Sequence, residues 1–569
     1  MTQEITYILQ KIFGADTPIE VVVSNEELFG HYSTNFALRQ AKVKGVPPLE
    51  LAKEYAAQIF AAAPAGFFQK VEAAAPGFIN FWLSEKKIQD EFKKIAADKK
   101  YGAGNIGQGK TVIVEYSQPN IAKKMHVGHM RTTIIGAALA NILELSGYRV
   151  VRWNYLGDWG TQFGKLIAAY KMWGDKKEIE KNPIEELQKL YVRFHEEMKT
   201  DPELEKRGRA EFKKLEEGDR ENRKLWEWIK KESLGEFKKI YRMLDVDFDE
   251  WIGEAFFEHE MKATVKELVD AHIAEKSEGA IVIKLDDVGL PPALIQKSDG
   301  ASLYLTRDIA NLRYRLKKYN PSKILYVVGN EQALAFEQLF AVAKKLGWNS
   351  AELKHIKYGL VLGERGRKLS TREGTAEFLE DLLGESVVKA REVIEVKNFD
   401  FPQKEKTEIA FAVAMGALKY NDLKENRTTD IIFNWEKMLD FSGDSAPYLQ
   451  YTYARLKSIV RKSKVRESKL TPAAIDVTML ARTAELALVR KLFEFPDIVE
   501  RAGDLYSTST LAVYLYKLAV TANKFYETTP ILKDEDRARR DARLLLIATT
   551  ARILQKGLGL LGIKTLEKI

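Results

Sequence analysis

The feature that most constrains the fold of this chain is an alternation of short apolar runs and helical stretches through its middle. Thr111–Tyr116 is a continuous run rich in β-branched residues, which is typical of a buried strand. A helical pattern follows over Met130–Leu145 and stops at Gly147, a residue suited to the end of a helix. Later strand patterns fall at Tyr148–Tyr155, Ile324–Val328 and Ile356–Leu362. Strands that alternate with helices predict an α/β fold with a doubly wound parallel sheet.

The sequence on either side of this alternation predicts separate domains. Residues 1–108 combine a helical pattern at Pro48–Ala63 with a strand pattern at Gly77–Leu83, which indicates a small α+β domain. Four glycines within Gly102–Gly109 mark its end. The remaining regions are an α/β domain at 109–376 with a charged helical insertion at about 175–250, a connecting helical region at 377–448 and an all-helical C-terminal domain at 449–569.

The helical regions are predicted from apolar residues that recur with a period near 3.6. In the insertion these patterns cover Glu185–Met198, Glu203–Leu215 and Asn222–Leu244. In the C-terminal domain they cover Leu449–Lys462, Asp476–Phe493 and Arg537–Leu558.

Composition excludes several classes of protein. The chain has 569 residues and no cysteine, which excludes disulfides, thiolate zinc sites and cysteine nucleophiles. Its 89 Lys and Arg against 81 Asp and Glu give a net charge of +8, which permits either a nucleic-acid partner or a solvated basic surface. No stretch approaches the roughly 20 apolar residues of a membrane span, and the first residues lack the form of a signal peptide. We therefore expect a soluble cytoplasmic protein with no membrane association.

His126-Val-Gly-His129 stands where the loop after the strand Thr111–Tyr116 enters the next helix. In a doubly wound sheet this corner is the ligand crevice, where the N–H groups of a helix N-terminus meet phosphate. Gly128 permits close approach of the backbone, and two imidazoles three residues apart can donate to phosphate oxygens. Such strings also occur by chance, but the position after a strand favours a nucleotide site. A metal site is disfavoured, because no third ligand accompanies the two histidines.

The string resembles the His-Ile-Gly-His signature of class I aminoacyl-tRNA synthetases, and its surroundings resemble the arginyl-tRNA synthetases. The segments that carry the resemblance are Ser117–Gly136, Asn154–Gly164, Tyr304–Ala310, Tyr448–Arg455, Tyr32–Ala37, Gly77–Phe81 and Leu558–Ile563. They span nearly the whole chain. The resemblance implies a Rossmann-type catalytic domain, an additional N-terminal domain that contacts the tRNA elbow and a helical anticodon-binding domain.

The resemblance also implies how the small substrates are held. The residues that match the family's arginine contacts are Glu115, Asn120, His126, Tyr304, Asp308 and Gln332. A guanidinium carries a fixed charge and five N–H donors, so the carboxylates of Glu115 and Asp308 suit it. The residues that match ATP contacts are His126, Gly128, His129, Lys368, Ser370 and Arg372.

Lys368-Leu-Ser-Thr-Arg372 resembles the second class I signature, Lys-Met-Ser-Lys-Ser, with Thr371 in place of its second lysine. Another cation is then needed at the pyrophosphate end of ATP, and Lys123 matches the position of the substitute in related enzymes. The catalytic residues implied are His126, His129, Lys123 and Lys368. In the alternative interpretation Lys123 and Lys124 are solvated and steer tRNA, and Arg372 is the substitute.

The activity implied is that of an arginine–tRNA ligase, which forms arginyl-adenylate and pyrophosphate from L-arginine and ATP and then transfers arginine to the 3′ end of tRNA(Arg). Mg²⁺ is expected with ATP, whereas a zinc site and an editing domain are not, and we expect a monomer. The alternatives are a class I synthetase of another specificity, a nucleotidylyltransferase of the same fold and a non-catalytic RNA-binding protein. A synthetase for cysteine is disfavoured, because that family uses a cysteine-containing zinc site and this chain has no cysteine. A synthetase for glutamate is disfavoured, because it would need a basic pocket rather than Glu115 and Asp308.

Overall fold

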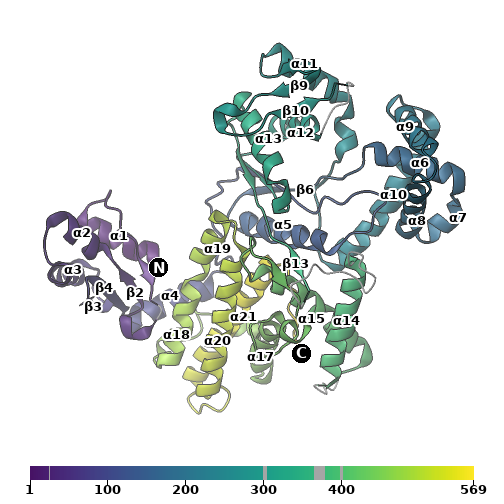
Figure 1. Cartoon of the computed structure of the whole chain (residues 1–569). Coiled ribbons are helices and arrows are strands. Elements are labelled where there is room, and N and C mark those ends of the chain that lie inside the picture. Colours follow the sequence, from purple (N-terminus) through teal and green to yellow (C-terminus); the bar gives the residue numbers. More distant parts are fainter. Residues whose placement is uncertain (25, 299–303, 364–377, 397–400) are drawn as a thin grey trace.

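A five-stranded parallel sheet of order β12-β11-β5-β6-β7 lies at the centre of the protein (Figure 1). The computed structural model describes residues 1–569 except 25, 299–303, 364–377 and 397–400. The strands are β5 (Thr111–Glu115), β6 (Arg149–Asn154), β7 (Glu250–Trp251), β11 (Lys323–Tyr326) and β12 (Glu352–His355). The chain runs from β5 outward to β6 and β7 and returns to β11 and β12 on the other side of β5. The predicted doubly wound sheet is therefore confirmed, and its topological switch point lies between β5 and β11.

The two faces of β5 belong to two different hydrophobic cores. Val112 and Val114 face one core and Ile113 the other, and all three are fully buried. Ile113 pairs with Val151 on β6 and with Ile324 on β11, which sets the register of the sheet centre. The helices that cover the sheet are α5 (Val127–Leu145) on the first face and α12 (Tyr304–Tyr319) and α13 (Ala333–Lys345) on the second. A strand buried on both faces explains why its sequence is uninterruptedly apolar.

The predicted helical insertion is present, and Figure 1 shows it projecting from the sheet. It contains α6 (Thr161–Trp173), α7 (Lys176–Lys181), α8 (Pro183–Glu197), α9 (Glu203–Glu216) and α10 (Arg220–Met243). After α11 (Met261–Asp270) the chain forms a small antiparallel sheet of β8 (Glu275–Ser277), β9 (Ala280–Ile283) and β10 (Ala293–Gln296). The sequence interpretation missed this sheet, because its strands are three or four residues long.

One predicted strand is wrong in position. The pattern at Ile356–Leu362 is apolar, yet β12 precedes it at Glu352–His355 and is an edge strand whose charged residues reach solvent. Val361–Leu362 forms a separate strand, β13, which pairs with β14 (Ile431–Ile432). The residues between β12 and β13 leave the sheet and line the pocket described below.

The C-terminal part is helical. Its helices are α14 (Leu379–Val396), α15 (Gln403–Leu423), α16 (Trp435–Met438), α17 (Ala446–Lys462), α18 (Thr483–Phe493), α19 (Phe495–Asp504), α20 (Thr508–Thr528) and α21 (Arg537–Leu560). The helix predicted from Asp476 begins only at Thr483, because Glu485 accepts hydrogen bonds from the N–H groups of Ala481 and Arg482 and fixes the helix start there. Within the described part of the chain, no helix is long and apolar enough to cross a membrane.

The N-terminal unit lies at one end of the molecule and is attached to the helical C-terminal part (Figure 1). Its elements are α1 (Thr2–Phe13), α2 (Phe36–Lys44), α3 (Pro48–Ala62), α4 (Glu85–Ala97) and a four-stranded sheet of β1 (Val22–Val23), β2 (Tyr32–Thr34), β4 (Phe78–Leu83) and β3 (Phe68–Ala74). Gln89 of α4 donates to the carbonyl of Leu480 at 2.9 Å, and Arg552 of α21 donates to the carbonyl of Ile95 at 2.6 Å. Helix α4 therefore connects the two parts, together with the ion pair between Glu27 and Arg490 of α18.

Candidate active site

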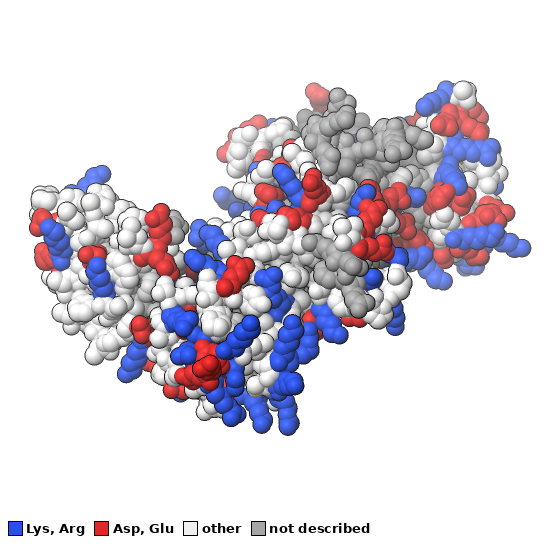
Figure 2. Space-filling model, turned by 90° about the horizontal axis from the view of Figure 1, so that it is seen from below, with Lys and Arg blue, Asp and Glu red and all other residues white. Residues whose placement is uncertain are grey.

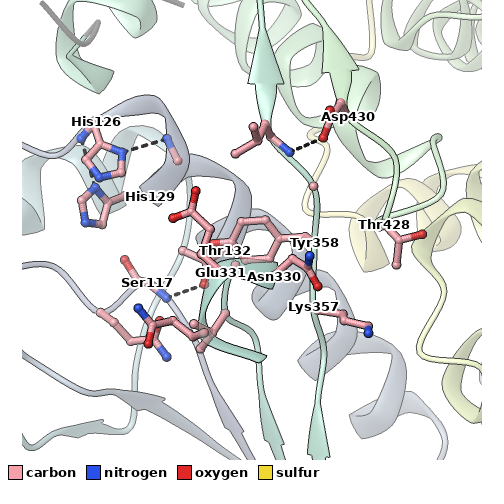
Figure 3. Close-up of a pocket in the computed structure, with 17 residues that line it drawn as sticks. Ser117, His126, His129, Thr132, Asn330, Glu331, Lys357, Tyr358, Thr428 and Asp430 are labelled. Carbon is pink, nitrogen blue, oxygen red and sulfur yellow. Dashed lines mark hydrogen bonds between the residues drawn. The ribbon is translucent and has the colours of Figure 1, made fainter. Parts of the chain in front are cut away.

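A pocket of about 770 Å³ opens at the switch point of the sheet. Its walls come from the loop after β5, the first turn of α5, the segment after β11, the residues between β12 and β13, and the segment before β14 (Figure 3). The pocket therefore lies at the carboxyl ends of the central strands, where doubly wound folds bind nucleotides. Thr132 of α5 joins two of these walls, since its hydroxyl accepts from the N–H of Ser117 at 3.1 Å and donates to the carbonyl of Val327 at 2.6 Å.

His126 and His129 are oriented by backbone amides at the start of α5. His126 is the N-cap residue, and its Nδ1 accepts from the N–H of Gly128 at 3.1 Å. His129 Nδ1 accepts from the N–H of His126 at 3.0 Å, and the two rings lie 3.9 Å apart (Figure 3). Because each Nδ1 is an acceptor, each neutral ring carries its proton on Nε2 and can donate it to a ligand.

The electrostatic surroundings keep both imidazoles neutral. Burial lowers the pKa of His126, and burial together with the neighbouring His126 lowers the pKa of His129 to about 3. A Cβ on Gly128 would stand 2.8 Å from the His126 ring, so glycine is required for this turn. The corner thus presents neutral Nε2–H donors beside the N-terminus of a 19-residue helix, an arrangement suited to phosphate.

Glu115 and Asp308 belong to a buried cluster of charges next to this pocket. Glu115, at the end of β5, accepts from Gln118 Nε2 at 2.7 Å and from Arg315 of α12. Burial, reinforced by Glu115 and the nearby Glu254, raises the pKa of Asp308 to about 8. Burial also raises the pKa of Glu254 to about 7, although Arg307 lies 3.5 Å away. A cation bound here would lower these pKa values and favour the charged form of the carboxyls, with release of a proton at neutral pH.

The structure brings only part of the predicted set to one cavity. The predicted residues that line the pocket are His126, Gly128, His129 and Gln332. The backbone of Asn120 pairs with Gly157, Tyr304 at the start of α12 is 71% exposed, and Lys123 is exposed with its Nζ 5.3 Å from the Tyr191 ring. The predicted second signature, with Lys368, Ser370 and Arg372, lies outside the described residues.

Several residues of the site were missed by sequence reasoning. Thr428 and Asp430 line the pocket from a segment 300 residues after His126, and Asp430 accepts from the N–H of Leu360 at 2.6 Å. The fully buried Arg131 holds this segment by donating to the carbonyls of Arg427 and Thr429, each at 3.1 Å. No local pattern in the sequence predicts these contacts.

Glu254 was also missed, although a weak signal for it exists. It follows Gly253, where a Cβ would stand 2.5 Å from Asp158. Asp158 is fully buried and accepts from the N–H of Ala255 at 2.8 Å, which fixes the backbone around Glu254. The local signal for Glu254 is the pair Gly253-Glu254, a glycine followed by an acidic residue.

No group of three or more metal-ligating side chains occurs among the described residues. The pocket does contain two carboxylates, Glu331 and Asp430, from separate walls.

The fold and the pocket define the class of protein. A doubly wound sheet whose switch point holds His-x-Gly-His at a helix start, followed by a helical C-terminal domain, is the architecture of a class I aminoacyl-tRNA synthetase. Residues 91–435 match the family described as tRNA synthetases class I (R), catalytic domain. Residues 449–569 match the DALR anticodon binding domain, and residues 1–83 match the arginyl tRNA synthetase N terminal domain.

Comparison with individual proteins narrows the class. The chain is 43% identical to the arginine–tRNA ligase of Fusobacterium nucleatum, with 97% of this chain and 95% of that protein covered. It is 45% identical to the arginine–tRNA ligase of Clostridium perfringens, with 88% of each covered. The crystal structure of arginyl-tRNA synthetase from Plasmodium falciparum superposes with a TM-score of 0.82 at 28% identity, covering 100% of this chain and 98% of that one. The chain belongs to the arginyl-tRNA synthetase family, as the sequence resemblance predicted.

Proposed function

We propose that this protein is an arginine–tRNA ligase whose arginine subsite is the cluster around Glu115 and Asp308. The observation that carries the proposal is the charge of that cluster. The strongest charges acting on Asp308 are the carboxylates Glu115 and Glu254 and the guanidiniums Arg307 and Arg315. When all three carboxyls are ionised, they exceed the two guanidiniums by one negative charge, which a single cationic side chain of a substrate would neutralise.

In the first step the carboxylate oxygen of arginine attacks the α-phosphorus of ATP. The bond between the α-phosphorus and its bridging oxygen breaks, and pyrophosphate leaves with both electrons of that bond. The Nε2–H groups of His126 and His129 donate to phosphate oxygens as charge develops on them. Lys123 and Lys368 supply positive charge towards pyrophosphate. No protein nucleophile is needed, so catalysis consists of positioning and charge stabilisation.

In the second step a ribose hydroxyl of the terminal adenosine of tRNA attacks the carbonyl carbon of arginyl-adenylate, and AMP leaves. The ATP that enters is accompanied by Mg²⁺ on its phosphates, and we assign the ion no resident ligand set. The remaining predicted contacts, Asn120, Tyr304 and Gln332 to arginine and Ser370 and Arg372 to ATP, belong to the same proposal.

The tRNA would be bound by the two ends of the chain. Residues 1–108 contact its elbow, and the helical residues 449–569 bind its anticodon. A second pocket of about 820 Å³ supports the latter role, since Arg455 lies 4.8 Å from the Tyr451 ring and 5.4 Å from the Tyr526 ring. Aromatic rings and arginine planes stack on unpaired bases. Figure 2 shows Lys and Arg side chains gathered over the helical C-terminal part of the molecule.

We further propose that one chain acts alone, in the cytoplasm where charged tRNA is consumed. Sedimentation of the protein with and without tRNA tests the monomer, and a dimer that forms without tRNA would contradict it.

The test of function is aminoacylation of total tRNA with each amino acid in turn, together with pyrophosphate exchange in the presence of tRNA. Arginine alone should be esterified. Efficient transfer of another amino acid would assign a different class I specificity, and adenylate formation without any transfer would favour a nucleotidylyltransferase.

A further inference from the structure

A resident arginine occupies the floor of the acidic cluster. Arg315 lies on the same face of α12 as Asp308, seven residues later, and its side chain is fully buried. Its guanidinium carbon lies 4.3 Å from the ring of Trp153 on β6 and 5.5 Å from the ring of Tyr326 on β11. It therefore sits across the carboxyl ends of the three central strands, where the substrates are bound.

The hydrogen bonds of this guanidinium are directed to one carboxylate. Arg315 Nη2 donates to Glu115 Oε2, while Nε and Nη1 have no hydrogen-bond partner within the described part of the chain. The aromatic rings stabilise the rest of the cation through their π-faces. A buried arginine with this environment has one strong directional contact, and that contact is to Glu115.

Glu115 is consequently held from two sides before any ligand arrives. Arg315 donates to Oε2 and Gln118 donates to Oε1 at 2.7 Å, so the rotation of the carboxylate is fixed. Gln118 also lines the nucleotide pocket. Without Arg315, Gln118 would still bind Oε1, but Oε2 would lose the charged donor that fixes the rotation of the carboxylate.

We propose that Arg315 is a positioning residue for arginine recognition, which holds the Glu115 carboxylate in the orientation that the guanidinium of the substrate needs. The proposal rests on the proposed role of Glu115 in the arginine subsite. Arg315 itself does not touch the reacting atoms. Its loss should therefore weaken arginine binding selectively and leave the handling of ATP intact.

The experiment measures KM for arginine, KM for ATP and kcat by pyrophosphate exchange at saturating tRNA. Arg315→Lys keeps the buried charge but loses the planar fork, and Arg315→Gln keeps donors but loses the charge. We expect both to raise KM for arginine by about 10–100-fold, the effect of misplacing one charge-assisted hydrogen bond, with KM for ATP within about twofold. Arg313→Gln is the matched control, because Arg313 lies on the same helix but pairs with Glu260 and Glu267 at its surface.

A double-mutant cycle with Glu115→Gln separates positioning from a general structural role. If Arg315 acts through Glu115, adding Arg315→Lys to Glu115→Gln should raise KM for arginine by less than about twofold further. Additive effects, an equal rise in KM for ATP, or an unchanged KM for arginine in folded Arg315→Lys or Arg315→Gln would each overturn the proposal. An unchanged KM for arginine in Glu115→Gln alone would instead overturn the arginine subsite. Thermal unfolding of every variant shows which of them are folded and can be compared.

Discussion

At the scale of single residues, the site depends on atoms whose protonation is set by burial. Both signature histidines use Nδ1 as an acceptor, so each neutral ring carries its proton on Nε2, and burial lowers both pKa values and favours the neutral form. Asp308 is the opposite case, because its pKa of about 8 leaves it mostly protonated at neutral pH until a cation binds. The two kinds of group predict different pH behaviour.

Arginine binding should strengthen as pH rises through the pKa of Asp308. Below pH 8 the carboxyl must release a proton to pair with the guanidinium, so KM for arginine should fall by about fivefold between pH 7 and pH 8 and by no more than about twofold above pH 8. Glu254, with a pKa of about 7, adds to this dependence mainly below pH 7. Asp308→Asn should raise KM for arginine, flatten its profile above pH 7 and leave KM for ATP nearly unchanged. A wild-type pH profile in that variant would contradict the assignment.

Lys123→Ala should lower kcat for adenylate formation by roughly 10²–10³-fold with little change in KM for ATP, if the lysine stabilises charge on pyrophosphate. Lys124→Ala is the control, since the neighbouring lysine lies 4.8 Å from the Phe378 ring and has no expected catalytic role. If Lys123 only steers tRNA, kcat stays near wild type and KM for tRNA becomes salt-sensitive. That result would leave Arg372 as the substitute cation.

At the scale of elements, the close packing of α5 on β5 holds the two histidines over the end of the sheet. Gly136 of α5 lies against Tyr116, and an added Cβ would stand 2.3 Å from that side chain. Tyr116 is fully buried and its hydroxyl donates to the carbonyl of Asp247, so it has no room to move. The glycine therefore sets the distance between helix and strand.

Gly136→Ala should destabilise the catalytic domain by about 1–3 kcal/mol, the usual cost of overpacking a rigid core, and should also lower kcat as α5 shifts. Gly235→Ala on α10 is the matched control, because a Cβ there meets nothing within 4 Å on an exposed helix surface. That change should stabilise locally by about 0.5–1 kcal/mol. Thermal unfolding and kcat should be measured for both variants. Equal changes in stability and in kcat for Gly136→Ala and Gly235→Ala would refute the packing argument.

At the scale of the whole molecule, the N-terminal unit contacts the C-terminal helices through α4 and also through residues before it, since Glu27 pairs with Arg490. Besides Gln89, the Tyr101 hydroxyl donates to the carbonyl of Leu492 at 3.0 Å, so α4 and the residues after it are part of the helical core. A deletion of residues 1–108 would therefore expose the C-terminal helices as well as remove the elbow contact. A deletion that ends before α4 keeps the contacts of Gln89 and Tyr101 and is therefore the better test of the N-terminal unit.

Deletion of residues 1–83 should leave arginine and ATP kinetics at saturating tRNA unchanged and weaken tRNA binding. Each phosphate contact that is lost should lower the slope of log Kd against log salt by about 1, because fewer counterions are released on binding. Binding titrations at several salt concentrations measure this slope. A folded deletion variant that binds tRNA as tightly as the whole chain, with the same slope, would remove the elbow role.

Local patterns predicted those parts of the protein whose burial repeats along the chain. The β-branched run at Thr111–Glu115 is buried on both faces, and the helices of the insertion and of the C-terminal part bury one regular face, so their periods are visible in the sequence. The position of His126-Val-Gly-His129 at a helix start could be predicted, because the strand, the loop and the start of the helix follow one another directly in the sequence. Where burial is irregular, as at the edge strand Glu352–His355, the same reasoning misplaced the element.

By itself, therefore, the sequence determined the class of fold and the family through its motifs, and it placed the histidine string at the corner between a strand and a helix. Only the tertiary structure decided that Thr428 and Asp430 complete the pocket, that Arg131 holds them there, and that Arg315 pairs with Glu115. The order of the strands and the docking of the C-terminal helices bring these residues together across 200 or more positions of the chain. The pKa of Asp308 has the same origin, because it depends on burial and on charges contributed by three separate segments, none of which carries a local signal of the others.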